Sequence, residues 1–318
     1  MGNDTLLEIR DLEVFFKVES GILKAVNGID LVLQKGTTTG LVGESGCGKS
    51  TLGRSILGLY RPDNGRILFK GKDIHGHDRK ERKRFRKEVQ MIFQDPYASL
   101  DPLCVVSDII AEGMDIHGLY PGSERRGRVI ELLRMVGLSE GHANRFPHEF
   151  SGGQRQRIGI ARALSVEPEL IVCDEPISAL DVSIQAQIVN LIKELQKRMD
   201  LTYLFITHDL SMVRHISDRI AVMYLGSLME VAPADDLYEG SFHPYTRALL
   251  SAIPVADPEV ERRRKRILLP GDVPSPINLG DGCSFRKRCD MASDICRSVR
   301  PDLIERRPGH FVACHNTG

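Results

Sequence analysis

The chain has 318 residues, of which 42% are hydrophobic and 27% are charged, so it has enough apolar material for about two globular domains. Its 43 Lys and Arg residues balance 43 Asp and Glu residues, which argues against a uniformly basic nucleic-acid binder and against a disordered chain. No apolar run approaches the roughly 18 residues of a membrane span, and the N-terminus does not resemble a signal peptide. We therefore expect a soluble, cytosolic chain, whose role at a membrane would need a partner that spans it.

The N-terminal part of the chain is predicted to form strands. Residues 6–16 and 25–33 alternate apolar and polar side chains and are rich in β-branched residues. Residues 39–42 form a short apolar strand that leads into a Gly-rich loop and an amphipathic helix. Residues 61–74 then predict a turn and a further pair of strands.

A basic run at residues 79–88 contains seven basic and two acidic side chains. We expect a solvated helix face here, because long charged side chains favour water. A contact with an acidic partner, with nucleic acid or with anionic lipid headgroups is the alternative, and a second basic run at 262–266 poses the same choice.

The middle of the chain predicts helices that alternate with buried strands. Apolar residues recur at helical spacing in four segments, which are 105–116, 123–138, 151–168 and 183–199. Residues 169–176 and 201–209 are almost continuously apolar, which is typical of buried parallel strands, and 217–232 predicts a hairpin. This order indicates an α/β core around a parallel sheet, with an attached antiparallel β subdomain.

Two domains are expected from this pattern. The main domain covers residues 1–252 and includes a helical subdomain at about 95–165. Residues 253–282 are rich in Pro, Gly and charge, so we expect a linker into a small C-terminal extension that ends at residue 318.

The segment Gly43–Ser50 matches the phosphate-loop pattern G-x-x-x-x-G-K-[ST] in full, with a strand before it and a helix after it. Its glycines allow a tight turn that points backbone N–H groups at phosphates, next to a helix N-terminus. We expect Lys49 to reach the β- and γ-phosphates of ATP, Ser50 to ligate Mg²⁺ and Thr51 to bond the α-phosphate. The predicted ATP-binding residues of the loop are Gly43, Ser45, Gly46, Cys47, Gly48, Lys49, Ser50 and Thr51. A Gly-rich turn with a surface lysine is the alternative.

Cys47 lies inside this loop, where a helix N-terminus can lower the pKa of a thiol. We expect it to supply a backbone N–H, and a reactive thiolate is the alternative.

Acidic and imidazole side chains follow the predicted buried strands. Asp174 ends one strand and is expected to hold Mg²⁺, while the adjacent Glu175 is placed to polarise the attacking water as a general base. His208 follows the next strand at the edge where ligands of open α/β sheets bind, and we expect it to contact the γ-phosphate. Helix capping by the carboxylates and a structural histidine are the alternatives.

The segment FSGGQ, Phe150–Gln154, resembles the LSGGQ signature of ABC-transporter ATPases, with Phe in place of the first Leu. The other motifs occur in the order of that family: the phosphate loop, QMIFQDP with Gln94, the signature, LIVCDEP, SALD at 178–181 and THD with His208. The resemblance covers residues from about 5 to 315 and implies an α/β P-loop NTPase fold with a parallel-sheet core, an antiparallel β subdomain, a helical subdomain and a small Cys-rich extension.

The resemblance also implies roles for residues outside the phosphate loop. Phe16 would stack on adenine, with Phe15 as a rival, and Gln94 would sense the γ-phosphate and Mg²⁺ and face the membrane subunit. The residues expected to act across a dimer of ATPase subunits are Ser151, Gly152, Gly153, Gln154 and Asp181. The first four would contact the nucleotide bound by the opposite subunit, so that hydrolysis depends on dimer closure.

Three further segments, 94–102, 243–254 and 271–285, resemble the C-terminally extended ATPases of bacterial dipeptide and oligopeptide importers, and the signature region resembles the type usually encoded last. This implies a heterodimer with a related ATPase, two transmembrane permease subunits and an extracellular or periplasmic peptide-binding protein, with no nucleic acid. The subunit would lie peripherally on the cytoplasmic face of the bacterial inner membrane. An importer of nickel or another small solute, a soluble non-transport ABC ATPase, and a non-hydrolysing regulatory subunit are the alternatives.

Four of the seven cysteines, Cys283, Cys289, Cys296 and Cys314, fall within the last 36 residues. Disulfides are rare in the cytosol, so a metal site is expected, yet the spacing lacks the C-x2–4-C knuckles of zinc sites. Resemblance to the peptide-importer extension implies a [4Fe–4S] cluster, with zinc or free thiols as alternatives. We expect the nearby His310 and His315 to be surface residues.

Overall fold

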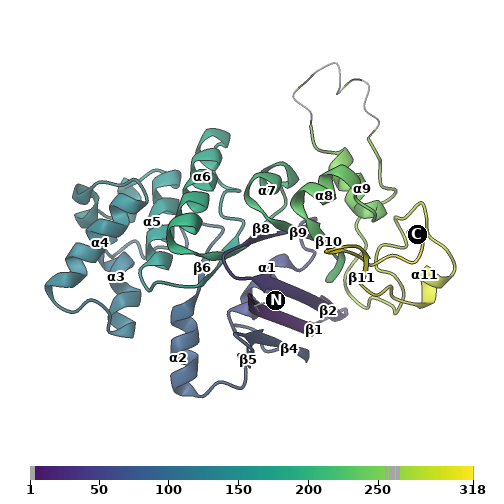
Figure 1. Cartoon of the computed structure of the whole chain (residues 1–318), viewed down its shortest axis with the longest axis horizontal. Helices are drawn as coiled ribbons and strands as arrows, with labels where there is room; N and C mark the ends of the chain where they lie inside the picture. The colour runs from purple at the N-terminus through teal and green to yellow at the C-terminus, as the bar shows by residue number, and fades with distance from the viewer. Residues whose placement is uncertain (1–3, 255–256, 258–261, 263–265, 318) are drawn as a thin grey trace. The chain divides into compact units, whose positions relative to one another are not determined.

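The computed structural model describes residues 4–254, 257, 262 and 266–317 (Figure 1). The chain divides into two units. The first unit comprises residues 1–4, 34–37 and 72–206, and the second comprises 5–33, 38–71 and 207–318. Residues 263–265, in the second basic run, lie outside the described residues. No helix in the described part of the chain is both long and apolar enough to cross a lipid bilayer.

The first unit combines a parallel sheet with the longer helices. Its elements are β5 (Lys72–Asp73), α2 (Arg79–Glu88), β6 (Val89–Ile92), α3 (Val106–His117), α4 (Ser123–Met135), the 3₁₀ helices η1 (Glu140–Asn144) and η2 (Pro147–Glu149), α5 (Gly152–Leu164), β7 (Leu170–Asp174), α6 (Val182–Met199) and β8 (Thr202–Thr207). Strand β7 pairs in parallel with β6 and with β8. All residues of β7 and β8 are buried, which confirms the two predicted buried parallel strands.

The predicted helical subdomain is present in this unit as α3, α4 and α5, which pack on one another (Figure 1). Each helix buries one apolar face, including Ile110 and Met114 of α3, Leu132 and Leu133 of α4 and Ile158 of α5. This packing stabilises short helices that would be marginal in isolation.

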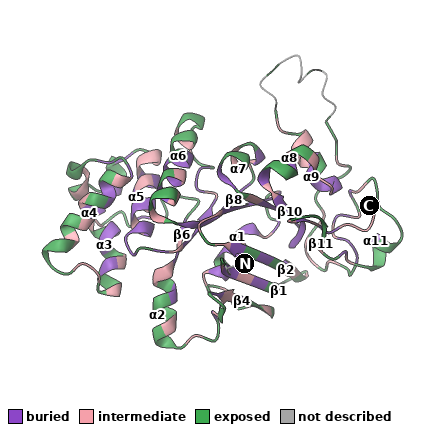
Figure 2. Cartoon of the chain, in the orientation of Figure 1, coloured by how far each residue is buried: buried purple, intermediate pink, exposed green. Residues whose placement is uncertain are grey.

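Helix α2 coincides with the basic run at 79–88. Asp78 caps it by accepting a hydrogen bond from the backbone N–H of Glu81 at 2.8 Å, and the Glu81 carboxylate accepts from the N–H of Asp78 at 3.3 Å. Within this helix only Phe85 is buried. The predicted helix is therefore present, and Figure 2 shows it as largely exposed, while the choice between a solvated face and a contact surface stays a prediction.

The second unit is built mainly from strands. Its elements are β1 (Thr5–Val18), β2 (Gly21–Gln34), β3 (Thr38–Val42), α1 (Lys49–Ile56), β4 (Asn64–Phe69), α7 (Leu210–Ile216), β9 (Arg219–Tyr224), β10 (Ser227–Pro233), α8 (Ala234–Gly240), α9 (Pro244–Ser251), α11 (Ile295–Ser298), β11 (Ile304–Arg307) and β12 (His310–Val312). Strand β1 lies between β2 and β4 and pairs with β4 in antiparallel register, with Leu7 opposite Phe69. This is the antiparallel β subdomain expected from the N-terminal sequence.

A second sheet of this unit carries the phosphate loop. Strand β3 pairs in parallel with β9, which forms an antiparallel hairpin with β10, as predicted for residues 217–232. The hairpin does not end the sheet, because β12 pairs with β10 and β11 pairs with β12. Residues from the C-terminal segment thus complete the sheet of the second unit, while the domain limits at 252 and 253 stay a prediction.

The expectation that His310 is a surface residue is wrong. Its Nε2 lies 2.7 Å from Oε1 of Glu230, and both side chains are fully buried. The Glu230 carboxylate also accepts hydrogen bonds from the backbone N–H groups of Phe242 and His243, at 2.6 and 3.2 Å. A buried carboxylate needs such partners, so this cluster ties β12 and the chain before α9 to β10.

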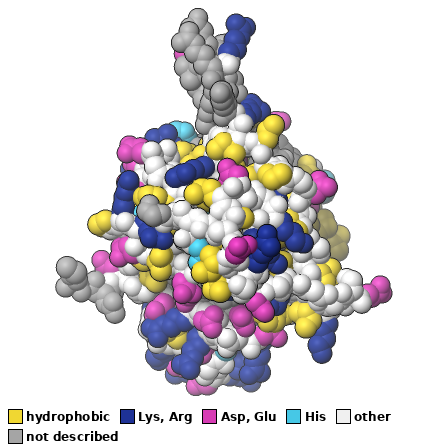
Figure 3. Space-filling model, turned by 90° about the vertical axis from the view of Figure 1, so that its right-hand side faces the viewer, with side chains coloured by type: hydrophobic (Ala, Val, Ile, Leu, Met, Phe, Trp, Pro, Cys, Tyr) yellow, Lys and Arg dark blue, Asp and Glu magenta, His cyan; other side chains and the backbone are white. Residues whose placement is uncertain are grey.

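Charge is distributed as the composition suggests. On the face drawn in Figure 3, Lys and Arg side chains occur together with Asp and Glu side chains and with scattered hydrophobic ones. This mixture agrees with the zero net charge of the chain, since neither sign covers the whole face.

The buried His243 makes the stability of the second unit sensitive to acid. Its Nδ1 caps α9 by accepting from the backbone N–H of Tyr245 at 3.1 Å, and burial lowers its pKa to about 4. The nearby Arg247 also lowers this pKa, and Glu230 raises it. The unfolded chain has an ordinary histidine pKa of about 6.5, so it binds the additional proton as pH falls from about 6.5 to about 4.

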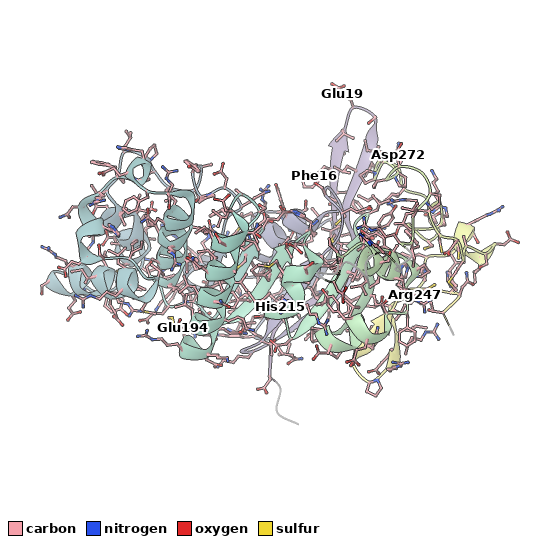
Figure 4. The ribbon with its side chains drawn as sticks, turned by 90° about the horizontal axis from the view of Figure 1, so that it is seen from above. Phe16, Glu19, Glu194, His215, Arg247 and Asp272 are labelled. Carbon is pink, nitrogen blue, oxygen red and sulfur yellow. The ribbon has the colours of Figure 1, made fainter. Side chains whose placement is uncertain are left out.

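We expect the unfolding free energy of the wild-type chain to fall by about 2 kcal/mol more than that of His243→Asn between about pH 7.5 and pH 5. Asparagine keeps a capping acceptor but does not titrate, although its smaller contact with Phe285 lowers stability at both pH values. Urea titrations at the two pH values measure the difference. His215→Asn, at an exposed site on α7 (Figure 4), is the matched control and should keep the wild-type pH dependence. Equal pH dependence of wild type and His243→Asn would contradict this assignment.

Candidate functional site

The phosphate loop follows directly from β3, whose residues are all buried. A Cβ atom at Gly43 would lie 2.1 Å from the carbonyl oxygen of Met223, and one at Gly48 would lie 1.9 Å from the carbonyl oxygen of Ala25. Gly48 also has a left-handed φ of 104°. Only glycine fits at these two positions, because the loop backbone packs directly against the backbone of β9 and β2.

Lys49 begins α1 and is buried, with 4% of the residue's surface exposed. Its ammonium group donates hydrogen bonds to the carbonyl oxygens of Gly43 at 2.7 Å and Glu44 at 2.9 Å. Ser45 and Gly46 form the exposed rim of the loop. The loop therefore presents a lysine and a helix N-terminus, which are the groups that bind phosphate. The contacts expected of Ser50 and Thr51 stay predictions.

Cys47 is buried, and its Sγ lies 3.7 Å from the ammonium nitrogen of Lys49. Burial raises the pKa of this thiol more than the neighbouring lysine lowers it. The alternative of a reactive thiolate is therefore disfavoured, because the nucleophile is the charged form.

The first unit brings Gln94 and Glu175 together. Gln94 follows β6 and Glu175 follows β7, and these parallel neighbours end at the same edge of the sheet. The Gln94 side-chain amide donates a hydrogen bond to Oε2 of Glu175 at 3.1 Å. The adjacent Asp174 is buried at the end of β7. An amide and two carboxylates at one strand edge form a set of oxygen donors suited to Mg²⁺ and to a water molecule.

Glu175 has a strained backbone, with a left-handed φ of 45°. Its N–H donates to the carbonyl oxygen of Ile206 in β8 at 3.0 Å, and its own carbonyl accepts from the hydroxyl of Ser178 at 3.1 Å. Non-glycine residues adopt this conformation mainly where the surroundings enforce it, often at active sites. These contacts therefore fix the position of the Glu175 carboxylate.

The signature segment begins α5 in the first unit. The hydroxyl of Ser151 accepts from the N–H of Gln154 at 3.3 Å, and the Gln154 side chain accepts from the N–H of Ser151 at 3.0 Å. This reciprocal cap orients the start of the helix. A Cβ atom at Gly153 would lie 2.6 Å from the side chain of Ile184, while Gly152 has more space. Phe150 is buried, so the change from Leu to Phe keeps an apolar anchor.

Three further predicted residues lie on exposed or partly exposed sites. His208 follows β8 and is exposed, beside Asp209, whose side chain caps α7. Asp181 is exposed at the N-terminal boundary of α6. Phe16 lies on the β1–β2 hairpin (Figure 4), where its ring meets Tyr60 edge-on at 5.3 Å between centroids. The rival Phe15 has the Lys24 ammonium 5.6 Å from its ring centre instead.

The four late cysteines are gathered in the second unit. Cys283 and Cys296 are buried, and the N–H of Cys283 donates to the carbonyl oxygen of Cys296 at 2.9 Å. Cys283 interacts electrostatically with Cys289, Cys296 and Cys314. Burial raises the pKa of Cys283, and it raises that of Cys289 to about 11, so these free thiols keep their protons at neutral pH. Among the described residues, no group of three or more His, Cys, Asp or Glu side chains has a metal-binding arrangement.

Sequence reasoning missed three residues that contact the phosphate loop or support it. Glu44 lies inside the matched pattern at a variable position, and its carboxylate binds Arg288 at 2.9 Å. The hydroxyl of Tyr245 accepts a hydrogen bond from the N–H of Glu44 at 3.1 Å. The partners are more than 200 residues away along the chain, so no local pattern could have indicated these contacts.

Comparisons with known proteins agree with this geometry. A model of the family "ABC transporter" matches residues 26–178, and one described as "Oligopeptide/dipeptide transporter, C-terminal region" matches residues 229–296. Among solved structures, the chain resembles cbiO1 from Clostridium perfringens, part of the ABC transporter complex cbiONQ, with a TM-score of 0.66 and 30% identity over 74% of this chain and 92% of that one. A dimeric post-hydrolysis state of the ATP-binding cassette MJ0796, bound to ADP and Pi, gives a TM-score of 0.66 with 29% identity, covering 72% of this chain and 99% of the other. The expected P-loop fold is confirmed.

Curated relatives extend the similarity over nearly the whole chain. The oligopeptide transport ATP-binding protein OppF of Bacillus subtilis is 58% identical over 315 residues, covering 98% of this chain and 96% of the relative. The oligopeptide transport ATP-binding protein AppF of the same organism is 54% identical over 322 residues, covering 99% and 98% of the two chains. The chain therefore belongs to the family of ATP-hydrolysing, ATP-binding subunits of oligopeptide and dipeptide ABC transporters.

Proposed function

We propose that this protein hydrolyses ATP to energise the import of dipeptides or oligopeptides through a membrane-bound ABC transporter. The hydrogen bond between Gln94 and Glu175, beside the buried Asp174, is the observation that best supports hydrolysis, because it holds a base and metal-binding oxygens at one strand edge. The peptide cargo is inferred from the matched C-terminal family region and from the oligopeptide transport proteins that the chain resembles.

In the proposed mechanism, the backbone N–H groups of the phosphate loop and the ammonium of Lys49 bind the phosphates of ATP. Ser50, Gln94 and Asp174 would hold Mg²⁺, whose positive charge offsets the charge that develops on the phosphates. Glu175 accepts a proton from the attacking water, and His208 donates a hydrogen bond toward the γ-phosphate. Phe16 would stack on the adenine ring.

The remaining site residues are proposed to act between two ATPase subunits. Ser151, Gly152, Gly153 and Gln154 offer the capped N-terminus of α5, which suits a phosphate group from an opposite subunit. Asp181 would lie at the same dimer interface. A related second ATPase, two permease subunits and an extracellular or periplasmic peptide-binding protein would complete the transporter. The subunit would then lie at the cytoplasmic face of the membrane, and a homodimer is the alternative.

The four late cysteines are proposed to hold a [4Fe–4S] cluster with a structural role, and zinc is the alternative. The support is the chemistry of the donors, which are four thiols within the last 36 residues, although the described side chains are not in a metal-binding arrangement. Because burial favours the protonated thiols, binding of a metal must displace protons, so occupancy should increase with pH.

Glu175→Gln should lower kcat for ATP hydrolysis by about 100-fold or more while leaving the Kd for ATP within about twofold, because the amide cannot accept the proton. Lys49→Ala should instead weaken ATP binding itself by about tenfold or more. Both are measured on the assembled transporter, by phosphate release and by ATP titration. Glu194→Gln, at an exposed site on α6 (Figure 4), is the matched control. Normal hydrolysis by Glu175→Gln would show that the base lies elsewhere.

Peptide import is tested with the transporter reconstituted in vesicles. We expect ATP-dependent uptake of labelled dipeptides or oligopeptides, with uptake lost in the Glu175→Gln variant. Uptake of nickel ions, but not of peptides, under the same conditions would favour the alternative importer. ATP hydrolysis without any transport would point to a non-transport ATPase.

If the four cysteines hold the cluster, protein purified without oxygen should contain about four iron atoms per chain and absorb light at about 400 nm. Cys296→Ser should lower the iron content, while Cys104→Ser, outside the group of four, should not. About one zinc atom per chain, without iron, would show that the cysteines hold zinc and not a cluster. Absence of both metals from the fresh protein would leave free thiols as the correct assignment.

A further inference from the structure

Glu44, the second residue of the phosphate loop, is held at three points. Its N–H donates to the hydroxyl of Tyr245 at 3.1 Å, and its carbonyl oxygen accepts from the Lys49 ammonium at 2.9 Å. Its carboxylate accepts from Nη1 of Arg288, at 3.1 Å for one oxygen and 2.9 Å for the other. Two of these three partners come from the C-terminal part of the chain, which has no role in the expected chemistry of ATP.

Arg288 is itself well anchored. It lies in a turn between Cys283 and Cys289, where its N–H donates to the carbonyl oxygen of Phe285 at 3.0 Å. Only 10% of its side chain is exposed. A charged group that is this far removed from water needs a carboxylate partner, and Glu44 supplies it.

An aromatic cluster lies next to this contact and supports it. The ring centroids of Tyr224 and Tyr245 lie 4.8 Å apart, and Phe285 lies 5.2 Å from Tyr224 and 5.3 Å from Tyr245. All three rings are buried. The cluster packs β9, α9 and the cysteine-containing turn into one core, so the position of Arg288 relative to the loop is fixed by close packing.

We propose that Arg288 is a positioning residue for ATP, through which the C-terminal segment prepares the phosphate loop to bind nucleotide. Two physical effects follow from the ion pair. Arg288 holds the backbone of Glu44 in place, and with it the carbonyl oxygen that orients Lys49. It also neutralises a carboxylate inside a loop that must bind negatively charged phosphates. Without Arg288, the Glu44 charge would repel those phosphates.

The inference goes beyond the proposed function, because it depends neither on the peptide cargo nor on a metal at the cysteines. It rests only on ATP binding by the phosphate loop. If the wild-type chain does not bind ATP, the proposed function is wrong. If the wild-type chain binds ATP and Arg288→Met binds it equally well, only this inference is wrong.

The test is a double-mutant cycle on the full-length chain, with the Kd for ATP measured by titration and with KM and kcat measured on the assembled transporter. Arg288→Met should raise Kd and KM about tenfold and leave kcat within about twofold. Glu44→Gln should raise them only about threefold, because it loses the ion pair without leaving a charge. The double variant should resemble Glu44→Gln, so removing the Glu44 charge rescues most of the defect of Arg288→Met.

Two matched variants complete the design. Lys287→Met changes an exposed neighbour in the same turn and should bind ATP like the wild type. Arg288→Lys keeps the charge and should raise Kd by no more than about threefold. If Arg288→Met does not fold, as judged by thermal unfolding, Arg288→Lys and Glu44→Gln still decide the question.

An unchanged Kd in Glu44→Gln or in a folded Arg288→Met would overturn the proposal. Simple additivity of the two changes would also overturn it, because residues that act through one ion pair must be coupled. So would a loss of kcat at unchanged KM, since that pattern indicates a role in the transition state only.

Discussion

The phosphate loop depends on a close approach of backbones that two glycines permit. Gly43 and Gly48 place the loop directly against carbonyl oxygens of β9 and β2, where any Cβ atom would collide. That packing turns the loop tightly enough for the carbonyl oxygens of Gly43 and Glu44 to accept hydrogen bonds from the Lys49 ammonium. The close packing that the glycines permit brings the lysine and the loop carbonyl groups together. Hydrogen bonds then hold them, because a hydrogen bond forms only between groups that are already close.

The arrangement of the residues proposed for metal binding and proton transfer has a different physical basis, which is the shared direction of neighbouring parallel strands. Because β6 and β7 are parallel neighbours, the residues that follow them emerge at one edge, and Gln94 meets Glu175 there. The strained backbone at Glu175 agrees with a position that its neighbours impose. The residues proposed for phosphate binding and those proposed for proton transfer thus belong to separate units of the chain.

The C-terminal segment is more than an appendage to the second unit. Its strands β12 and β11 extend the sheet beyond β10, and the buried contact between His310 and Glu230 joins them to that sheet. The cysteine-containing turn contributes Phe285 and Arg288 to the core next to the phosphate loop. A segment that is continuous with the core in this way can influence nucleotide binding mechanically, since packed interiors transmit displacement.

Much of the fold and of the candidate site could be predicted because it is encoded in local patterns. The buried strands β7 and β8, the basic helix α2, the hairpin of β9 and β10 and the phosphate loop each have a recognisable periodicity or spacing within a few residues. The exposure of His310 was predicted wrongly because its partner Glu230 lies 80 residues away along the chain, so no local pattern indicates their contact.

The sequence by itself determined the family, the residues available for phosphate, metal and water, and the order of the secondary-structure elements. Only the tertiary structure decided which of these residues meet: Gln94 with Glu175, His310 with Glu230, and Arg288 with Glu44, across 81, 80 and 244 residues. The physical reason is that local patterns determine which face of an element is apolar. The partner of a buried charge depends instead on which distant element packs against that face.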